Sequence, residues 1–208
     1  MSPIHVSLIA EGLLDERVLR QLLSQAAPHL QAGVCYGKRG RNWMDKNLMK
    51  YNQAARTLPY VALADLEQVR CPPDLLHQWF PYGRHANLQA RIAVHMVEAW
   101  LLADGDALAE FLGIASHHIP KFPDQEANPK LVMVNLARRS RYRIIREDLA
   151  PPPGSSAVIG RNYPGQLEKF VYEKWQSERA QAHSPSLQRA IQALQGFHST
   201  VSGERMHV

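Results

Sequence analysis

Short apolar runs alternate with amphipathic stretches over the first half of the chain. Residues 4–10, 32–36, 60–64 and 91–97 form apolar runs of the length expected for buried strands. Between the first two runs, apolar residues at 14, 18, 19, 22 and 23 recur at helical spacing. Further helices are predicted over 42–56, 74–80 and 98–112. This alternation predicts an α/β fold with a doubly wound, mainly parallel sheet flanked by helices.

The second half of the chain has a mainly helical pattern. A helix is expected from Asn128-Pro129 to about Arg139, and two more over 165–180 and 184–195. The stretch Ala150-Pro-Pro-Pro-Gly-Ser-Ser156 fits either an ordered surface loop or a mobile lid. We therefore predict an α/β core over residues 1–115 and a helical C-terminal extension over 116–208, packed together as one compact unit.

Acidic residues follow three of the predicted strands. Glu11 ends the first run, Asp65 and Glu67 end the third, and Glu98 ends the fourth. Because open α/β sheets place their ligands at the carboxyl ends of their strands, we expect these carboxylates to share one crevice, with Glu98 at its rim. Clustered carboxylates repel one another and are costly to desolvate, so such a group typically holds a divalent cation. The alternative is that these acidic residues only cap helices and face solvent.

The composition of the chain gives limited information about the class of protein. The 208 residues are 45% hydrophobic and 21% charged, and no apolar run approaches the roughly 20 residues of a membrane span. The N-terminus lacks the features of a signal peptide, and Cys35 and Cys71 have no metal-type spacing. These features predict a cytoplasmic protein with free thiols and no membrane contact. The formal charge of +5 favours an anionic partner.

The order of the acidic motifs resembles the Toprim fold. That domain carries a Glu-Gly after its first strand and an Asp-x-acid pair after a later one. More narrowly, the chain is similar to a little-characterised Toprim-like bacterial family that is distantly like the overcoming-lysogenization-defect nucleases. The segments that carry this resemblance are 10–12, 65–67, 98–104, 128–130, 160–163 and 184–186. One departure is that Toprim domains typically have Asp-x-Asp where this chain has Asp65-Leu66-Glu67.

The resemblance implies a metal-dependent nuclease that cleaves phosphodiester bonds with Mg²⁺ or Mn²⁺. Asp65 and Glu67 are then the expected direct metal ligands, Glu98 completes the cluster, and Glu11 binds metal or transfers a proton. Members of the family are often encoded beside ABC-type or AAA ATPases in phage-defence loci. The resemblance therefore also implies an ATPase protein partner, a role as effector subunit of an anti-phage complex, and a nucleic-acid substrate, with DNA favoured over RNA.

Two basic stretches are candidates for nucleic-acid contact. The first contains Lys38, Arg39, Arg41 and Trp43, which offer cations for phosphates and an indole for stacking on a base. The second is an arginine-rich run that includes Arg138, Arg139 and Arg141. Lys130 and Arg161 are further candidates for neutralising transition-state charge. The alternative for each stretch is a solvated charged face.

Two other functions stay open on the sequence. One is a catalytically weak Toprim-like module that binds nucleic acid or a protein partner, with Glu67 in place of aspartate as its mark. The other is a doubly wound enzyme acting on a small phosphorylated ligand. That reading has little support, because neither a Gly-x-x-x-x-Gly-Lys nor a Gly-x-Gly-x-x-Gly loop follows any predicted strand.

Overall fold

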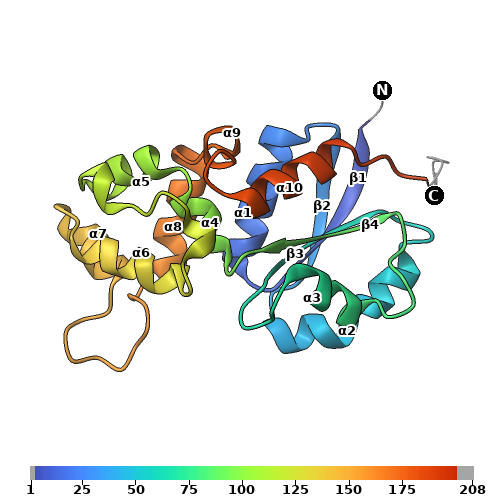
Figure 1. The fold of residues 1–208 in the computed structure, drawn as a ribbon, viewed down its shortest axis with the longest axis horizontal. Coiled ribbons are helices and arrows are strands. Elements are labelled where there is room, and N and C mark those ends of the chain that lie inside the picture. The colour runs from blue at the N-terminus through green and yellow to red at the C-terminus, as the bar shows by residue number, and fades with distance from the viewer. Residues whose placement is uncertain (1–2, 201–208) are drawn as a thin grey trace.

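The computed structural model describes residues 3–200 and contains a four-stranded, all-parallel sheet in the order β2-β1-β3-β4 (Figure 1). The strands are β1 (Ile4–Ala10), β2 (Leu30–Gly37), β3 (Tyr60–Asp65) and β4 (Leu88–Ala93). Ala10 lies opposite Leu63, and Asp65 lies opposite Ala93, so the carboxyl ends of the central strands are close to level. The predicted α/β class, with a parallel sheet flanked by helices, is confirmed.

Helices cover both faces of the sheet because side chains alternate along the strands. On one face, Leu8 and Leu63 pack into an apolar cluster with α1 (Leu13–Ala26). On the other face, Ile9 and Ala62 pack with α2 (Arg41–Ala54) and α3 (Pro72–Trp79). Since α1 and α2 lie on opposite faces, the chain direction switches between β1 and β3, which is where doubly wound sheets form their crevice.

The rest of the chain is helical and lies against the α1 face and beyond one end of the sheet (Figure 1). Helix α10 runs beside β4 and also contacts α1, and α8 and α9 contact α1 as well. One apolar cluster therefore joins the sheet to the C-terminal helices. Besides α10 (Pro185–Gln195), these helices are α4 (Val97–Leu102), α5 (Gly105–Leu112), α6 (Pro129–Arg138), α7 (Arg143–Leu149), α8 (Tyr163–Glu173) and α9 (Ser177–Ala180), with 3₁₀ turns at Ser116–His118 and Pro123–Gln125.

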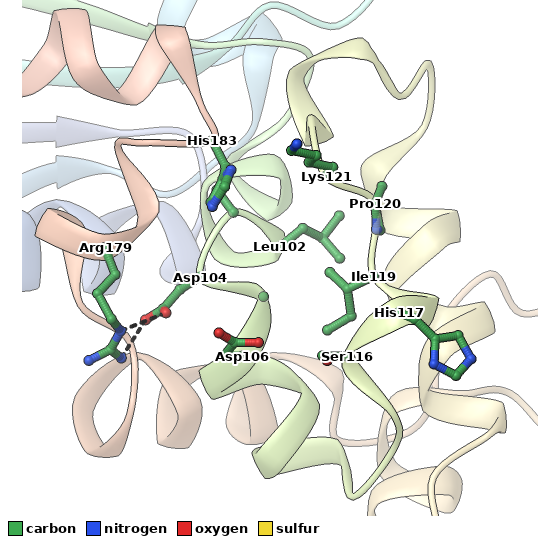
Figure 2. Close-up of a pocket in the computed structure, with 12 residues that line it drawn as sticks. Leu102, Asp104, Asp106, Ser116, His117, Ile119, Pro120, Lys121, Arg179 and His183 are labelled. Atoms are coloured by element: carbon green, nitrogen blue, oxygen red, sulfur yellow. Dashed lines mark hydrogen bonds and ion pairs between the residues drawn. The ribbon is translucent and has the colours of Figure 1, made fainter.

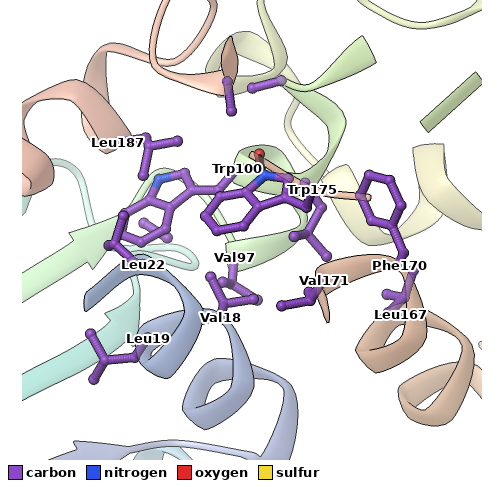
Figure 3. Packing of buried hydrophobic residues seen from close by; sticks show 14 of the residues in the cluster. Val18, Leu19, Leu22, Val97, Trp100, Leu167, Phe170, Val171, Trp175 and Leu187 are labelled. Carbon is purple, nitrogen blue, oxygen red and sulfur yellow. Dashed lines mark hydrogen bonds between the residues drawn. The ribbon is translucent and has the colours of Figure 1, made fainter. Parts of the chain in front are cut away.

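Two buried tryptophans connect the core to these helices (Figure 3). Trp100 of α4 donates its indole N–H to Ser186 Oγ at 2.7 Å. Trp175, which follows α8, donates its indole N–H to the carbonyl of Trp100 at 2.9 Å. Both indoles are fully buried among side chains of α1, α4, α8 and α10. Since every polar atom of the two rings has a partner, the tryptophans add apolar contact without an unsatisfied donor.

The fourth strand begins and ends earlier than predicted. It covers Leu88–Ala93, not 91–97, and pairs along its whole length with β3. Because β3 ends at Asp65, β4 has no partner beyond Ala93 and leaves the sheet there. Residues 94–96, which include a cis Val94–His95 peptide bond, connect it to α4. Glu98 therefore lies in the first turn of a helix and does not follow a strand directly.

Two predicted helices are broken, and one helix was missed. The segment 98–112 divides into α4 and α5 at Asp104, whose carboxylate bonds to the Gln176 backbone and to Arg179. The segment 165–180 divides into α8 and α9 where Trp175 turns into the core. In both cases a long-range contact holds the break. The arginine-rich run contains α7, for which no element was predicted.

Two expectations drawn from composition can be compared with the structure. Cys35 and Cys71 are free thiols, as predicted. Within residues 3–200, none of the helices has both the length and the apolar character required to cross a membrane.

Candidate functional site

Glu11 follows β1 and lies between the carboxyl ends of β1 and β3. Its Oε1 accepts hydrogen bonds from the backbone N–H of Asp65 and from Nη1 of Arg41, each at 3.2 Å. The side chain is only 9% exposed. Glu11 thus connects the two central strands at the place where the sequence predicted that carboxylates would gather.

A second carboxylate, that of Asp15, lies in the first turn of α1. Its Oδ2 accepts a hydrogen bond from the N–H of Gly12 at 2.9 Å. A Cβ at Gly12 would lie 3.0 Å from that oxygen, so glycine leaves room for this capping contact. The other oxygen, Oδ1, is buried and has no hydrogen-bond partner.

The remaining two acids meet at the start of α4. Oδ1 of Asp65 accepts a hydrogen bond from the N–H of Val97 at 2.7 Å. Glu98 is 1% exposed, and its Oε1 accepts a hydrogen bond from the hydroxyl of Tyr163 at 3.2 Å. The Nζ of Lys130 lies 3.5 Å from the same oxygen. Oε2 of Glu98, like Oδ1 of Asp15, is buried without a hydrogen-bond partner.

Glu11, Asp15, Asp65 and Glu98, hereafter the acidic cluster, interact electrostatically. Burial raises the pKa of Asp65 well above its ordinary value, and the charges of Asp15, Glu98 and Glu11 raise it further. Burial and the charge of Glu98 raise the pKa of Asp15 to about 6. Like charges held close together in a desolvated crevice are costly, so this cluster favours protons or a cation.

Glu11 has the pKa most relevant to proton transfer near neutral pH. Burial raises it from 4.5 to about 7, while the charge of Arg41 opposes the increase and those of Asp15 and Glu67 add to it. A carboxyl group that titrates near pH 7 can both accept and release a proton under physiological conditions.

Two cations lie against the acidic cluster. Arg41 bonds to Glu11 and also donates from Nη1 to the carbonyl of Asp65 at 2.7 Å. Burial lowers the pKa of Lys130, but the charges of Glu98, Asp65 and Asp15 outweigh that effect and raise it. Both residues were predicted to contact nucleic acid, whereas in the structure each is paired with a carboxylate of the cluster.

The positions expected for Glu67 and Glu98 are reversed. Glu98, expected at the rim, lies inside the protein. The side chain of Glu67 is exposed, and its backbone adopts a left-handed φ of 52°. The Glu67 N–H donates to the carbonyl of His95 at 2.9 Å, which fixes this turn beside the crevice. Its charge still contributes to the raised pKa of Glu11, so Glu67 lies at the outer edge of the cluster.

The first basic stretch lies partly inside the protein. Lys38 forms an ion pair with Glu16 at 3.0 Å, and the Trp43 indole packs against the apolar cluster of α2 and α3. Gly37, with a φ of 94°, makes the turn possible, because a Cβ there would lie 2.5 Å from the Ala10 carbonyl. Only Arg39 of the four predicted contacts is exposed and has no ion pair or hydrogen bond described for it within residues 3–200.

The second basic group lies on α6 and the segments around it. Arg138, Arg139, Arg141 and Arg161 are all exposed. The guanidinium of Arg141 stacks on Tyr142, 4.9 Å from the ring centroid. Arg161 donates from Nε to Asp148 at 3.1 Å.

Two members of the site were not assigned from the sequence. No role in the site was predicted for Asp15, although its position four residues after Glu11 could have placed it beside that carboxylate. Tyr163 lies in the segment 160–163 that carries the family resemblance, but no role in the site was predicted for it. Its contact with Glu98 spans 65 residues of chain, and no local pattern indicates such a contact.

A separate cavity of about 320 Å³ lies at the junction of α4, α5 and α9. Leu102 and Ile119 line it, and the carboxylate of Asp104 is held by Arg179 at its edge (Figure 2). Nδ1 of His183, which also lines the cavity, is buried without a hydrogen-bond partner. The Asp104–Arg179 pair fixes the break between α4 and α5, so we assign this wall of the cavity a structural role.

Comparison of the chain with protein-family models, with curated proteins and with solved structures found no match. Among residues 3–200, no three His, Cys, Asp or Glu side chains are grouped as a ready-made metal site. The acidic cluster is therefore the feature from which we infer a function. Its described contacts are to Arg41, Lys130, Tyr163 and backbone N–H groups.

Proposed function

We propose that the protein is a Mg²⁺- or Mn²⁺-dependent nuclease of the Toprim-like type. The observation that carries this proposal is the pair of buried carboxylate oxygens, Asp15 Oδ1 and Glu98 Oε2, for which residues 3–200 provide no hydrogen-bond partner. Burying a carboxylate oxygen without a hydrogen-bond partner costs free energy, and hard divalent cations prefer such oxygens as ligands. The location at the carboxyl ends of parallel strands supports the same interpretation.

Within residues 3–200 the carboxylates are not grouped as a ready-made metal site, so a cation would have to draw them together. Asp15, Asp65 and Glu98 would hold it, and a bound divalent ion would polarise a phosphate oxygen and lower the pKa of water. Glu11, with a pKa of about 7, would accept the proton of the attacking hydroxyl group. Lys130 and Arg41 lie beside the cluster and would neutralise charge on the phosphate oxygens.

The substrate and cellular setting are part of the same proposal. The net charge of +5 and exposed arginines such as Arg39 and Arg161 support a nucleic-acid substrate, with DNA favoured over RNA. The resemblance of the acidic motifs to the Toprim-like family further supports a cytoplasmic effector subunit that works with an ABC-type or AAA ATPase in anti-phage defence. An ATPase encoded beside this gene would strengthen that assignment.

A second candidate function is a catalytically weak Toprim-like module that binds nucleic acid or a protein partner. The contact of Arg41 with Glu11 favours it, because the guanidinium occupies a place that a metal would otherwise take. The exposed position of Glu67 points the same way, since it offers no buried ligand. The two candidates differ in whether the acidic cluster binds a divalent cation.

Metal binding can be tested without activity. We expect Mn²⁺ or Mg²⁺ to raise the melting temperature of the wild-type protein more at pH 8 than at pH 5.5, because protons compete with the cation for carboxylate oxygens at the lower pH. Asp65→Asn and Glu98→Gln should lose this shift, and isothermal titration should show the same loss. Glu178→Gln, which changes an exposed acid of α9, is the matched control. A wild-type shift retained in Asp65→Asn would mean that the metal binds elsewhere.

Cleavage is tested by nicking of plasmid DNA and cutting of single strands. Mn²⁺ should support the reaction first, since its coordination is laxer than that of Mg²⁺. Glu11→Gln and Asp65→Asn should each reduce the rate by several powers of ten, while Glu178→Gln keeps it. The assay should include the complex reconstituted with its ATPase. Cleavage that survives Asp65→Asn would exclude this subunit as the nuclease, and metal binding without cleavage by the complex would favour the weak module.

A further inference from the structure

A second cavity, of about 730 Å³, lies between α6, α7 and the loop that follows α7. Three arginines from separate segments line it: Arg138 at the end of α6, Arg146 in α7, and Arg161 before α8. Pro151, Pro152 and Pro153 form an apolar wall. The loop projects from the helical part of the molecule (Figure 1). We call this cavity the arginine pocket.

Protein contacts hold each arginine in place. Arg146 donates from Nη1 to the carbonyl of Ser140 at 2.6 Å. Arg138 donates from Nη1 to the side chain of Asn135 at 2.9 Å, and Arg161 donates from Nε to Asp148. A guanidinium has five N–H donors, so one such bond orients the group and leaves others for a ligand.

The one acid that lines the pocket, Glu147, is already paired. Arg143 donates to its carboxylate at 2.6 Å. That ion pair lowers the pKa of Glu147, so the side chain stays charged while Arg143 balances it. Asp148 balances the charge of Arg161, so the pocket keeps the positive charges of Arg138 and Arg146, for which no ion pair is described within residues 3–200.

The arginine pocket and the acidic cluster are connected by one short segment. Tyr163, which bonds to Glu98, lies two residues after Arg161. Two residues of extended chain span at most about 7 Å. The edge of the pocket at Arg161 and the Tyr163–Glu98 contact therefore lie on the same short segment of chain.

We propose that the arginine pocket binds the phosphodiester backbone of a single nucleic-acid strand next to the acidic cluster. The inference rests on the proposed function and names how its substrate is held. Arginine forks pair with phosphate oxygens, and the proline wall offers an apolar surface to a sugar or base. A cavity of this size exceeds the need of a lone inorganic phosphate, and this favours a polymer segment as its ligand.

The test measures binding by fluorescence anisotropy of a labelled single-stranded oligonucleotide in EDTA, so that nothing is cleaved. The triple variant Arg138→Gln, Arg146→Gln, Arg161→Gln should bind at least tenfold more weakly at low salt. Its plot of log affinity against log salt should flatten by up to about 2, since each phosphate contact on a single strand contributes about 0.7. The control Lys50→Gln, Arg56→Gln, Arg70→Gln removes the same charge from exposed residues of another region. Circular dichroism melts verify that both variants fold.

Each outcome decides one point. No wild-type binding, an unchanged slope in the pocket variant, or equal losses in both variants would overturn the inference. Binding of polyglutamate as tight as that of the oligonucleotide, lost in the pocket variant, would overturn it in favour of an acidic protein partner. Glu178→Gln, which changes an exposed acid of α9, should bind like the wild type. If oligonucleotide binding depends on the arginine pocket but no metal supports cleavage, the nuclease proposal fails and the inference about the pocket is kept. If the protein cleaves nucleic acid but the salt slope of the pocket variant is unchanged, the nuclease proposal is kept and the inference about the pocket fails.

Discussion

Three buried carboxyl groups contribute to the pH dependence of the free energy of unfolding. Glu11, Asp15 and Asp65 all have raised pKa values, and burial is the first cause in each case. The folded state therefore holds protons that the unfolded chain has already released above its ordinary carboxyl pKa. The free energy of unfolding falls as pH rises through that interval, because the unfolded state binds fewer protons than the folded state. The folded protein is therefore more stable when these carboxyl groups are protonated than when they are ionised with no cation bound.

Glu11→Gln should reveal this effect. The glutamine is neutral at every pH and keeps an oxygen that can accept from the Asp65 N–H. Since the pKa of Glu11 rises from 4.5 to about 7, and one unit corresponds to about 1.4 kcal/mol, the variant should be more stable than the wild type at pH 8 by on the order of 3 kcal/mol. Near pH 4.5 the gain should vanish. Urea unfolding in EDTA at both pH values measures it.

The matched control for this experiment is Glu178→Gln, an exposed acid outside the crevice. Its stability should follow that of the wild type at both pH values. A gain for Glu11→Gln of the same size at pH 4.5 and pH 8 would show that Glu11 has an ordinary pKa in the folded protein. The proton-transfer role proposed for it would then lose its physical basis.

The break between α4 and α5 is set by the contacts of one buried carboxylate, Asp104, and not by helix propensity. Asp104 is 2% exposed and accepts two bonds from Arg179 as well as one from the Gln176 backbone. It therefore fixes the start of α5 against the segment that leads into α9. The apolar spacing continues across residue 104, and this is why the sequence predicted one helix.

Asp104→Ala should destabilise the protein by about 2 kcal/mol, because it removes a buried acceptor that receives hydrogen bonds from the Gln176 N–H and from Arg179. Chemical denaturation at neutral pH measures the change. The control Asp106→Ala removes an exposed acid two residues further on and should change stability by less than about 0.5 kcal/mol. Equal effects of the two variants would mean that the ion pair contributes nothing.

Elements with strong local patterns were predictable from the sequence, and those set by distant partners were not. β1, β3 and α1 follow clear apolar periodicity and appear close to their expected bounds. The length of β4 depends on where its partner β3 ends, and the break at Asp104 depends on Arg179, 75 residues away. Neither dependence can be recognised in a sequence segment of a few residues.

The candidate site was predictable to the same extent. The position of Glu11 and Asp65 follows from strand order alone, so the sequence could bring them together. The inward position of Glu98 depends on Tyr163 and Lys130, which arrive from the helical extension. The outward position of Glu67 depends on its left-handed backbone, a conformation that sequence rarely indicates for glutamate.

At the scale of the whole molecule, the α/β core is incomplete without the C-terminal helices. Val18 and Leu22 of α1 and Trp100 of α4 share one apolar cluster with Val171 and Leu187. A fragment of residues 1–115 would expose this face to water. We expect it to lack a cooperative thermal transition and near-ultraviolet circular dichroism, whereas residues 1–200 should behave like the full chain. A fragment 1–115 that unfolds cooperatively would show that the extension is a separate unit.

The link between Trp100 and Ser186 also has a consequence for the newly made chain. The two residues are 86 positions apart, so the indole of Trp100 leaves the ribosome long before its partner does. At roughly 5–20 residues per second, the delay is about 4–17 s. During that interval the part of α1 that α10 covers in the folded protein stays exposed. This apolar surface of the nascent chain is therefore a binding site for a holdase chaperone until α10 has been made.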